Sequence, residues 1–490
     1  MSGRAAPRGL GPLRRRGFRF LVAGQLASNV GDAFYAVALP WYVLSEHGGP
    51  LLLGTVLAAY GVPRTALLSV GGHASDRWRP WTVMMSTDAV RALGVGALAV
   101  AAATGPARAA VLVPIAAVLG ASEGLFLPGS FSIVPTLLPG EELQAGNALA
   151  SAGTQLASLA GPAIGGALVA LFGPAPAFSL DAASFVVSAA TLCCVRAAVP
   201  PVPADAAPAA PGRARHPAGN ARPAGQSTHP AGQSTRLARE GARPAGQSTR
   251  PAREGARPAG LGAPAQHGKP TVLALLRSER ILQMALLITV AANLGSAGMD
   301  EVALPSLAHG PLHAGAAGYG GLVAAFGAGA LLGTLAAGQA ARARRPAVAA
   351  SVAFFAEALF IAVVPYLGGT LPAGGALAAL GVLNGFGNVV MLTVFQRWAP
   401  PELLGRLNGV LLTASFGVFP VSVALAALVV HGLGPAPFFP IAAVTVAVPL
   451  LLGLSQRTWR DFGMAGQPPA GAADGARPVP AATDALGRTS

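Results

Sequence analysis

Charged side chains inside long apolar stretches are the residues of this sequence best suited to chemistry. They are Asp32, Glu123, Asp300, Glu301 and Glu357, with Arg64 and Arg91 as the cations available to them. A charge at the centre of a lipid bilayer costs about 2.5–3.5 kcal/mol on insertion scales, so such residues usually face a cavity and serve function. A carboxylate withdrawn from water holds a proton more readily and can exchange it for a ligand. We therefore expect proton or substrate binding, with structural hydrogen bonds between helices as the alternative, at Asp32, Glu123, Asp300, Glu301 and Arg64.

Long apolar blocks must position these charges. Of the 490 residues, 53% are hydrophobic and 11% are charged, and the mean hydropathy is +0.55. A soluble domain carries about 25% charged residues, so this chain lacks the charge to cover a surface in water. The blocks exceed the ~20 residues that a helix needs to cross a bilayer, and helix is required because unpaired backbone amides are costly in lipid. We predict spans at 18–44, 51–72, 81–104, 109–137, 146–172, 176–198, 279–308, 315–340, 347–367, 371–396, 403–430 and 436–455.

The basic residues are distributed unevenly along the chain. The formal net charge is +14, which on its own could indicate a nucleic-acid partner. With an even number of spans and a cytoplasmic N-terminus, all of the 33 Lys and Arg residues except Arg64, Arg91 and Arg108 fall in cytoplasmic segments or at cytoplasmic helix ends. This asymmetry is the positive-inside rule. It predicts a multi-pass protein of the cell membrane, embedded in the lipid bilayer with both termini cytoplasmic, and no nucleic-acid partner.

The hydrophobic pattern divides the chain into five segments. We predict a cytoplasmic basic tail at 1–17, a six-helix bundle at 18–198, a cytoplasmic linker at 199–270, a second six-helix bundle at 271–456 and a cytoplasmic tail at 457–490. The linker is rich in Pro, Ala, Gly and Arg and repeats the run Pro-Ala-Gly-Gln-Ser-Thr. Because nothing in it could bury a core, we expect it to be disordered, and the last segment has the same character.

The two predicted bundles resemble each other. Asn-Val-Gly at 29–31 matches Asn-Leu-Gly at 293–295, Ala-Ala-Tyr-Gly at 58–61 matches Ala-Ala-Phe-Gly at 324–327, and Gly120 and Gly124 match Gly381 and Gly385. Each match is weak alone, but three in the same order indicate an internal repeat. Parallel six-helix repeats are a transporter design with the substrate site between the halves. The predicted fold class is an all-α membrane protein with twelve transmembrane helices in two parallel, pseudo-symmetric six-helix bundles.

Two short motifs carry a family resemblance. The segment after the second predicted helix reads Gly72-His73-Ala74-Ser75-Asp76-Arg77, and the fifth helix carries Gly161-Pro162-Ala163-Ile164-Gly165-Gly166. These resemble the Gly-x-x-x-Asp-Arg motif of the major facilitator superfamily and the Gly-Pro-x-x-Gly-Gly motif of its proton-coupled exporters. The resemblance covers nearly all of 18–456 apart from the linker. The first motif departs from the family at Arg79 and Pro80, where the family has Gly and a basic residue.

Several other segments look most like the branch of this superfamily that includes macrolide efflux pumps and enterobactin exporters. They lie at 18–21, 28–32, 63–64, 88–91, 126–128 and 142–149. The resemblance implies a secondary active exporter of drugs or other lipophilic or amphipathic small molecules, driven by the proton gradient through alternating access, without a cofactor and as a monomer. An uptake permease of the same fold and a non-transporting scaffold or sensor are the alternatives. No phosphate-binding loop, catalytic triad or metal-ligand cluster in the sequence argues for an enzyme or a metal site.

The resemblance also assigns roles to the motif residues. It implies a charge-linked latch that holds the outward-facing state, with Gly72 in a tight turn and Asp76 at the beginning of the third helix. The latch residues are Gly72, Asp76, Arg77, Asp88 and Arg91. Because Asp88 and Arg91 are three residues apart on one helix face, they could pair with each other. A simple helix cap is the alternative for Asp76.

The fifth helix and the aromatic residues have weaker assignments. The resemblance implies a seal between the two halves at Gly161, Pro162, Gly165 and Gly166, with ordinary helix packing as the alternative. Three aromatic residues could line the cavity, namely Phe34, Tyr35 and Tyr60. We do not expect Glu357 to bind a proton or substrate, because the ninth helix of this fold usually faces lipid or lies peripherally. The fourth predicted helix has no arginine in its membrane stretch, unlike that of many proton-coupled family members.

Overall fold

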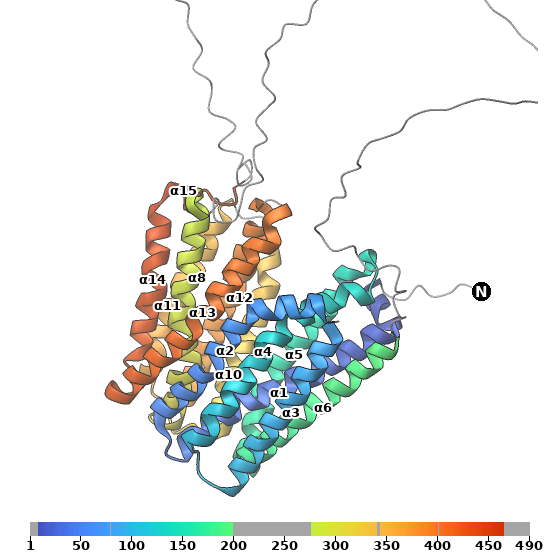
Figure 1. Cartoon of the computed structure of the whole chain (residues 1–490). Helices are drawn as coiled ribbons and strands as arrows, with labels where there is room; N and C mark the ends of the chain where they lie inside the picture. The colour runs from blue at the N-terminus through green and yellow to red at the C-terminus, as the bar shows by residue number, and fades with distance from the viewer. Residues whose placement is uncertain (1–7, 79, 199–275, 341–343, 400, 465–490) are drawn as a thin grey trace, which may run out of the picture. The chain divides into compact units, whose positions relative to one another are not determined.

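The computed structural model describes residues 8–78, 80–198, 276–340, 344–399 and 401–464. The predicted linker at 199–270 lies outside these residues, and so do the end of the chain from 465 onward and the side chain of Asp76. Every regular element within the described residues is a helix, as predicted for an all-α protein (Figure 1).

Six long helices form the N-half, which is preceded by the short 3-10 helix η1 (Arg8–Arg14). They are α1 (Arg16–Ser45), α2 (Gly49–Arg77), α3 (Pro80–Thr104), α4 (Ala109–Leu137), α5 (Gly140–Phe172) and α6 (Pro174–Ala198). Each is long enough to cross the hydrocarbon of a bilayer. The boundaries agree with the predicted spans to within a few residues, apart from α2 and α5, which are longer.

The C-half repeats this pattern with one irregular helix. Its first span runs through α8 (Arg280–Gly298), the π-helical turn η3 (Met299–Ala303) and α9 (Leu304–His309). The other helices are α10 (Gly315–Ala340), α11 (Pro346–Val363) with the 3-10 turn η4 (Val364–Tyr366), α12 (Thr370–Trp398), α13 (Pro401–Leu433), α14 (Phe438–Ser455) and the short α15 (Arg457–Arg460). A π-helical turn inside a longer helix often marks a functional site.

Eleven of these helices are long and apolar enough to cross a membrane. The helix outside this group is α1, which is 30 residues long but carries the polar residues Gln25, Asn29 and Asp32 in its middle. All three line an internal cavity, so the lower hydropathy of α1 reflects a cavity-facing side and does not contradict the twelve predicted helices.

The internal repeat is reproduced in the packing of glycine residues. A Cβ atom on Gly120 of α4 would collide with the carbonyl oxygen of Tyr60 on α2, and one on Gly381 of α12 would collide with that of Phe326 on α10. Gly124 against Arg64 and Gly385 against Ala330 form the next matching pair of contacts. Small residues allow helix backbones to approach closely within a membrane. Both halves therefore use the same glycines to hold equivalent helices together.

The two halves share one buried core and also have a separate core each. The largest cluster of buried side chains draws on both halves and includes Val43, Leu53, Leu307 and Tyr319. A second cluster, around Phe18 and its neighbours, belongs to the N-half alone, and a third, which contains Trp459, belongs to the C-half alone. We call the end of each half that holds Phe18 or Trp459 the tail end. The halves are packed together away from the tail end, where Trp41 and His309 place their rings 5.1 Å apart.

Two helix pairs make the seam between the halves. In the first pair, Gly320 of α10 lies so close to α5 that an added Cβ would collide with the Pro162 carbonyl oxygen and come within 2.9 Å of the Cα of Gly166. In the second pair, the Thr65 hydroxyl on α2 donates a 2.9 Å hydrogen bond to the backbone carbonyl of Phe416 on α13. The seam therefore needs small residues and direct backbone contact.

The structure corrects the prediction for the end of α2. Asp76 was expected at the beginning of the third helix and Gly72 in a tight turn, but α2 continues through both positions to Arg77, and α3 begins at Pro80. Position 76 therefore lies in the last turn of a helix and not at the beginning of one. The helix continues because positions 72–77 contain no proline, and the first proline comes at position 80.

The structure also corrects the beginning of the last segment. Residues 457–464 were predicted to belong to a disordered tail, but they form α15 and a turn. Trp459 is 1% exposed and donates a 3.1 Å hydrogen bond from its indole nitrogen to the Ser351 hydroxyl. Phe462 packs edge-on against Trp398 at 5.8 Å between ring centroids. The two aromatic side chains order this segment because they bury large apolar surfaces on the C-half.

Replacing Gly320 by alanine should destabilise the contact between the halves, because the new methyl group meets backbone atoms that cannot rotate away. We expect a loss of about 1–3 kcal/mol, as for overpacked positions, seen as a lower melting temperature of the purified protein. Gly321→Ala is the matched control, because a Cβ there meets nothing within 4 Å. Equal melting temperatures for the two variants would contradict the close approach of α5 and α10.

Trp459→Ala should destabilise the C-half, because it empties a fully buried site and leaves the Ser351 hydroxyl without its donor. Truncation of a buried aromatic residue costs about 3–5 kcal/mol. Limited proteolysis should then cut after α14 at protease concentrations that leave the wild type intact. Trp78→Ala is the control, because Trp78 is 59% exposed. Equal protection of both variants would show that α15 does not depend on its tryptophan.

Candidate functional site

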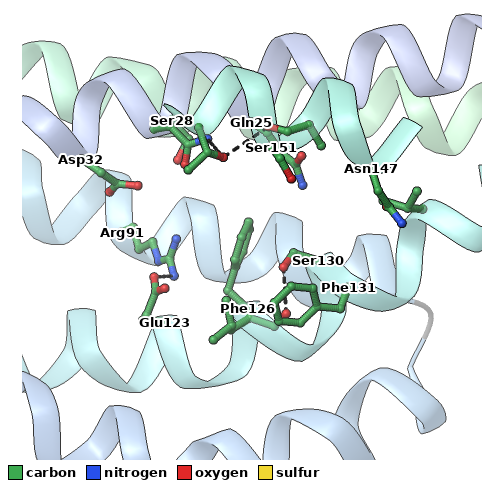
Figure 2. Close-up of a pocket in the computed structure, with 15 residues that line it drawn as sticks. Gln25, Ser28, Asp32, Arg91, Glu123, Phe126, Ser130, Phe131, Asn147 and Ser151 are labelled. Carbon is green, nitrogen blue, oxygen red and sulfur yellow. Dashed lines mark hydrogen bonds and ion pairs between the residues drawn. The ribbon is translucent and has the colours of Figure 1, made fainter. Parts of the chain in front are cut away.

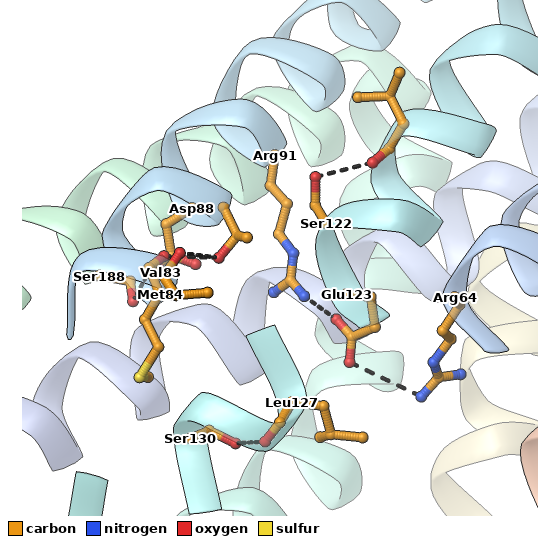
Figure 3. A network of polar contacts seen from close by, with 12 residues as sticks. Arg64, Val83, Met84, Asp88, Arg91, Ser122, Glu123, Leu127, Ser130 and Ser188 are labelled. Carbon is orange, nitrogen blue, oxygen red and sulfur yellow. Dashed lines mark hydrogen bonds and ion pairs between the residues drawn. The ribbon is translucent and has the colours of Figure 1, made fainter. Parts of the chain in front are cut away.

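Two arginines surround one carboxylate in the middle of the N-half (Figure 3). Arg91 of α3 donates a hydrogen bond from Nη2 to Oε2 of Glu123 on α4, and Nη2 of Arg64 on α2 lies 3.8 Å from Glu123 Oε1. The Arg91 side chain is 5% exposed, and those of Arg64 and Glu123 are 19% and 22% exposed. Arginine suits such a partly buried ion pair because its planar guanidinium can bind a carboxylate in a fixed geometry. The arginines of the site thus come from α2 and α3, and α4 supplies the carboxylate.

Close helix packing brings these three residues together. Gly124 follows Glu123 in the sequence, and an added Cβ at this glycine would lie 2.5 Å from the Arg64 carbonyl oxygen. The backbones of α2 and α4 are therefore in contact at the level of the ion pairs. A larger residue at position 124 would separate Arg64 from Glu123.

Aromatic rings cover both arginines. The Arg91 guanidinium carbon lies 4.5 Å from the centroid of the Phe126 ring, and that of Arg64 lies 4.1 Å from the Phe416 ring. A cation over an aromatic face gains about 0.5–2 kcal/mol, depending on how far it is desolvated. Phe416 belongs to α13, so Arg64 contacts a carboxylate of its own half and an aromatic ring of the other half.

Asp32 supplies the second carboxylate of the site. It lines a cavity of about 580 Å³ together with Arg91 and Glu123, and Figure 2 shows all three side chains at one end of this cavity. Polar side chains from α1 and α5, among them Asn29 and Thr154, continue the lining, and the Asn29 amide donates a 3.1 Å hydrogen bond to the Thr154 hydroxyl. The buried Asp181 of α6 lines a further small cavity of about 50 Å³ together with Asp32, Arg91 and Glu123. With Arg64, the site thus holds three carboxylates and two arginines, and its formal charges do not balance.

A second cavity connects the cluster to the C-half. It measures about 280 Å³ and is lined by residues of both halves, including Asp32, Tyr35, Tyr60, Glu301 and Phe419. Asp32 and Glu123 line both this cavity and the larger one. A proton or ligand could therefore reach the same carboxylates from either space. Of the three aromatic residues considered from sequence, Tyr35 and Tyr60 line this second cavity, whereas Phe34 lies beside Gly165, whose added Cβ would be 3.1 Å from its Cα.

Asp300 and Glu301, the two adjacent acidic residues of the C-half, do not face the same cavity. Both lie on the π-helical turn η3, but Glu301 lines the cavity between the halves, whereas Asp300 is exposed and is not among its lining residues. Successive residues on a helix point in different directions, so one cavity does not receive both. Glu301 thus joins Asp32, Glu123 and Arg64 at this cavity, and Asp300 does not.

Among the predicted latch residues whose side chains the structure describes, Asp88 and Arg91 do not pair. Asp88 is fully buried and accepts a 2.7 Å hydrogen bond from the Ser188 hydroxyl on α6, and it does not pair with Arg91 (Figure 3). Arg91 turns to Glu123 because a full charge in the apolar interior needs a partner of opposite charge. Arg77 is exposed, and Gly72 is a helical residue at which an added Cβ would meet nothing within 4 Å.

The glycines of the α5 motif divide between two neighbours. Added Cβ atoms on Gly161 and Gly165 would meet Ala33 and Phe34 of α1, within the N-half. Gly166 and the Pro162 carbonyl face α10 of the C-half at the seam. The motif therefore joins α5 to α1 on one side and to the opposite half on the other.

Glu357 and Asn384 form a buried polar pair in the C-half that was not predicted from the sequence. Glu357 was expected to be peripheral, but it is 6% exposed and accepts a 3.0 Å hydrogen bond from the Asn384 amide on α12. The repeat contained the signal for this pair, because the spacing that relates the two halves aligns Glu357 with Arg91 and Asn384 with Glu123. The same alignment relates Asn29 and Thr154 to Asn293 and Ser415, which form a 3.4 Å hydrogen bond.

Comparison with curated proteins finds exporters among the relatives. The chain is 32% identical over 165 residues to the multidrug efflux pump Tap of Mycobacterium tuberculosis, a match that covers 32% of this chain and 39% of the relative. It is 31% identical over 195 residues to the enterobactin exporter EntS of Salmonella typhimurium, which covers 38% of this chain and 45% of the relative. These matches thus span less than half the length of either relative.

Comparison with solved structures shows the fold. A peptide transporter, POT, superimposes with a TM-score of 0.63 at 14% identity, covering 92% of this chain and 96% of the other. A bacterial homologue of the iron transporter ferroportin, solved in an inward-facing state, has a TM-score of 0.59 at 13% identity, covering 89% and 98%. Residues 21–422 match the family described as the Major Facilitator Superfamily. The chain is a multi-pass membrane transporter and belongs to the Major Facilitator Superfamily.

Proposed function

We propose that this transporter is a proton-coupled exporter of drugs or other lipophilic or amphipathic small molecules. The observation that carries the proposal is the cluster of Asp32, Glu123, Arg64 and Arg91, whose two carboxylates line both the N-half cavity and the cavity between the halves. The exporters Tap and EntS, each similar over part of its length, support the direction of transport. The proton gradient would supply the energy, without a cofactor.

The ion pairs of Glu123 suggest how a proton could be coupled to movement. An ionised Glu123 attracts both Arg91 and Arg64. Protonation of Glu123 removes the attraction that holds Arg64 towards α4 and leaves the buried Arg91 without its ion-pair partner, which is costly in a low-dielectric site. Arg64 also lies over Phe416 of the C-half, so a change at Glu123 reaches the contact between the halves.

The seam supplies the conformational part of the cycle. The halves are packed together away from the tail end, where α5 meets α10 and α2 meets α13. For alternating access these contacts must separate while contacts form at the other end. We propose that the tail end is cytoplasmic, because the positive-inside rule places the basic termini there. The site would then open to the cytoplasm in this state, and the protein would act as a monomer in the cell membrane.

Asp32→Asn should abolish export, because the amide cannot release a proton into either cavity. Cells of an efflux-deficient bacterium that express this variant should accumulate lipophilic dyes and macrolides to the level of cells without the transporter. The wild type should reach the same level once the proton gradient is collapsed. Glu46→Gln is the control, because Glu46 is an exposed carboxylate at the end of α1. Equal accumulation in the wild type, with and without the gradient, and in cells without the transporter would remove the proposal. Lower accumulation in cells without the transporter would indicate an uptake permease.

Glu123→Gln should destabilise the N-half, because Arg91 loses its partner while it remains buried. Breaking a buried ion pair from one side costs about 3–5 kcal/mol, which a thermal melt of the purified protein can detect. The double variant Arg91→Gln/Glu123→Gln should recover much of this stability but none of the export. Glu142→Gln is the control, because its partner Arg15 is exposed and the pair should contribute little. Recovery of export in the double variant would show that the ion pair is only structural.

A further inference from the structure

The C-half contains a cavity of its own, at the position that corresponds to the large cavity of the N-half. It measures about 430 Å³ and is enclosed by α8, α11, α12, α13 and α14. Trp459 of α15 contributes to its lining at the tail end. A pocket of this size is in the range that holds small organic ligands.

At one matching position, the charge in this cavity is opposite to that in the N-half. Glu357 occupies the position that Arg91 occupies in the first repeat, and the neutral Asn384 occupies that of Glu123. Among the lining residues that the structure describes, Glu357 is the charged residue, and the other polar groups are amides and hydroxyls. A ligand of opposite charge would therefore find a negative site here and an already paired arginine in the N-half.

The carboxylate of Glu357 is oriented but only half satisfied. Asn388 donates a 2.8 Å hydrogen bond to the Asn384 side-chain oxygen, and Asn384 in turn donates to Oε1 of Glu357. The other oxygen, Oε2, is buried and has no hydrogen-bond partner within the described residues. A buried polar atom without a partner is costly, and in native proteins such atoms often mark a site for a ligand.

The rest of the lining is aromatic and apolar. Phe354, Phe395 and Trp459 supply rings, and Ile288 and Leu450 are among the aliphatic residues. Aromatic faces attract organic cations, and a desolvated contact of this kind contributes measurably to binding. Calcium and magnesium take six or more oxygen ligands at short distance, so one carboxylate in a large aromatic cavity does not suit them.

We propose that this cavity binds the cationic group of an organic substrate, with Glu357 as its counter-ion. This inference rests on the proposed function and deepens it, because it assigns a charge class, the lipophilic monocation, to the molecules exported. Asn384 and Asn388 are positioning residues, since they act through the orientation of the carboxylate. The N-half cluster keeps its separate role in proton coupling.

Binding of two probes of similar shape and opposite charge tests the proposal on the purified full-length protein. Isothermal titration calorimetry would compare tetraphenylphosphonium, a permanent cation, with tetraphenylborate, an anion. Glu357→Gln should weaken tetraphenylphosphonium binding by about ten- to a hundredfold, the range expected for loss of one charged partner. Tetraphenylborate binding should be unchanged or stronger, and it also reports whether the variant is folded. Glu357→Asp should recover part of the affinity for the cation, and Glu46→Gln should bind like the wild type.

Equal affinity of the wild type and Glu357→Gln for tetraphenylphosphonium would overturn the proposal. A heat signal that depends on Glu357 with sodium chloride, but not with the organic cation, would also overturn it, because the site would then be one for an inorganic ion. Since calorimetry does not require transport, the two proposals can fail separately. Binding at Glu357 without export in cells would reject the exporter, whereas export with unaltered binding in Glu357→Gln would reject this site.

Discussion

Two arginines held around one carboxylate, inside a bundle of apolar helices, are the interaction on which the N-half depends. A buried charge is costly, and pairing with an opposite charge lowers that cost. Arg64, Arg91 and Glu123 come from three different helices, so the pairing fixes α2, α3 and α4 relative to one another. The glycines of α4 permit this geometry, because they allow α2 to approach within backbone contact. Asp32 adds a second carboxylate from a fourth helix and lines the N-half cavity.

The two halves use one packing scheme for two kinds of chemistry. Gly120 and Gly124 correspond to Gly381 and Gly385 in position and in contact, so the helix framework is repeated closely. The polar side chains on this framework are not repeated, since an ion pair in one half becomes a carboxylate held by an amide in the other. Glycines at helix contacts cannot change without moving backbones, whereas cavity side chains can change freely. Such a division lets one half specialise in proton coupling and the other in ligand recognition, as we propose.

The helices were more predictable than the contacts among their charges. The length of the apolar blocks predicts nearly every span, because a helix must be long enough to cross the bilayer. The matching glycines predict the repeat, because helices that pack closely in lipid need small residues at their contacts. The partners of Arg91 and Asp88 could not be found in this way. Their spacing on α3 favours pairing with each other, yet neighbouring helices offer Glu123 and Ser188 in better positions. The burial of Glu357 was missed for a related reason. Its helix was expected to be peripheral because the ninth helix of this fold usually is, and the alignment of Glu357 with Arg91 was not considered. The order in 457–464 depends on tertiary burial of Trp459, which composition does not reveal.

The hydrogen bond from Thr65 to the Phe416 carbonyl has a consequence for how the halves come apart. That carbonyl lacks its usual acceptor role within α13, because the residue four positions later is Pro420, which has no N–H to donate. The Thr65 hydroxyl of the opposite half lies 2.9 Å from this carbonyl and 2.9 Å from the Gly61 carbonyl of its own helix, so the two carbonyls share one donor. In the proposed transport cycle, separation of the halves takes this hydroxyl away from the carbonyl, at a cost of about 1–3 kcal/mol unless a water molecule replaces the hydroxyl. In that cycle, water must reach the Phe416 carbonyl as the halves separate. Pro420 causes this need, because it leaves the carbonyl without a donor in its own helix.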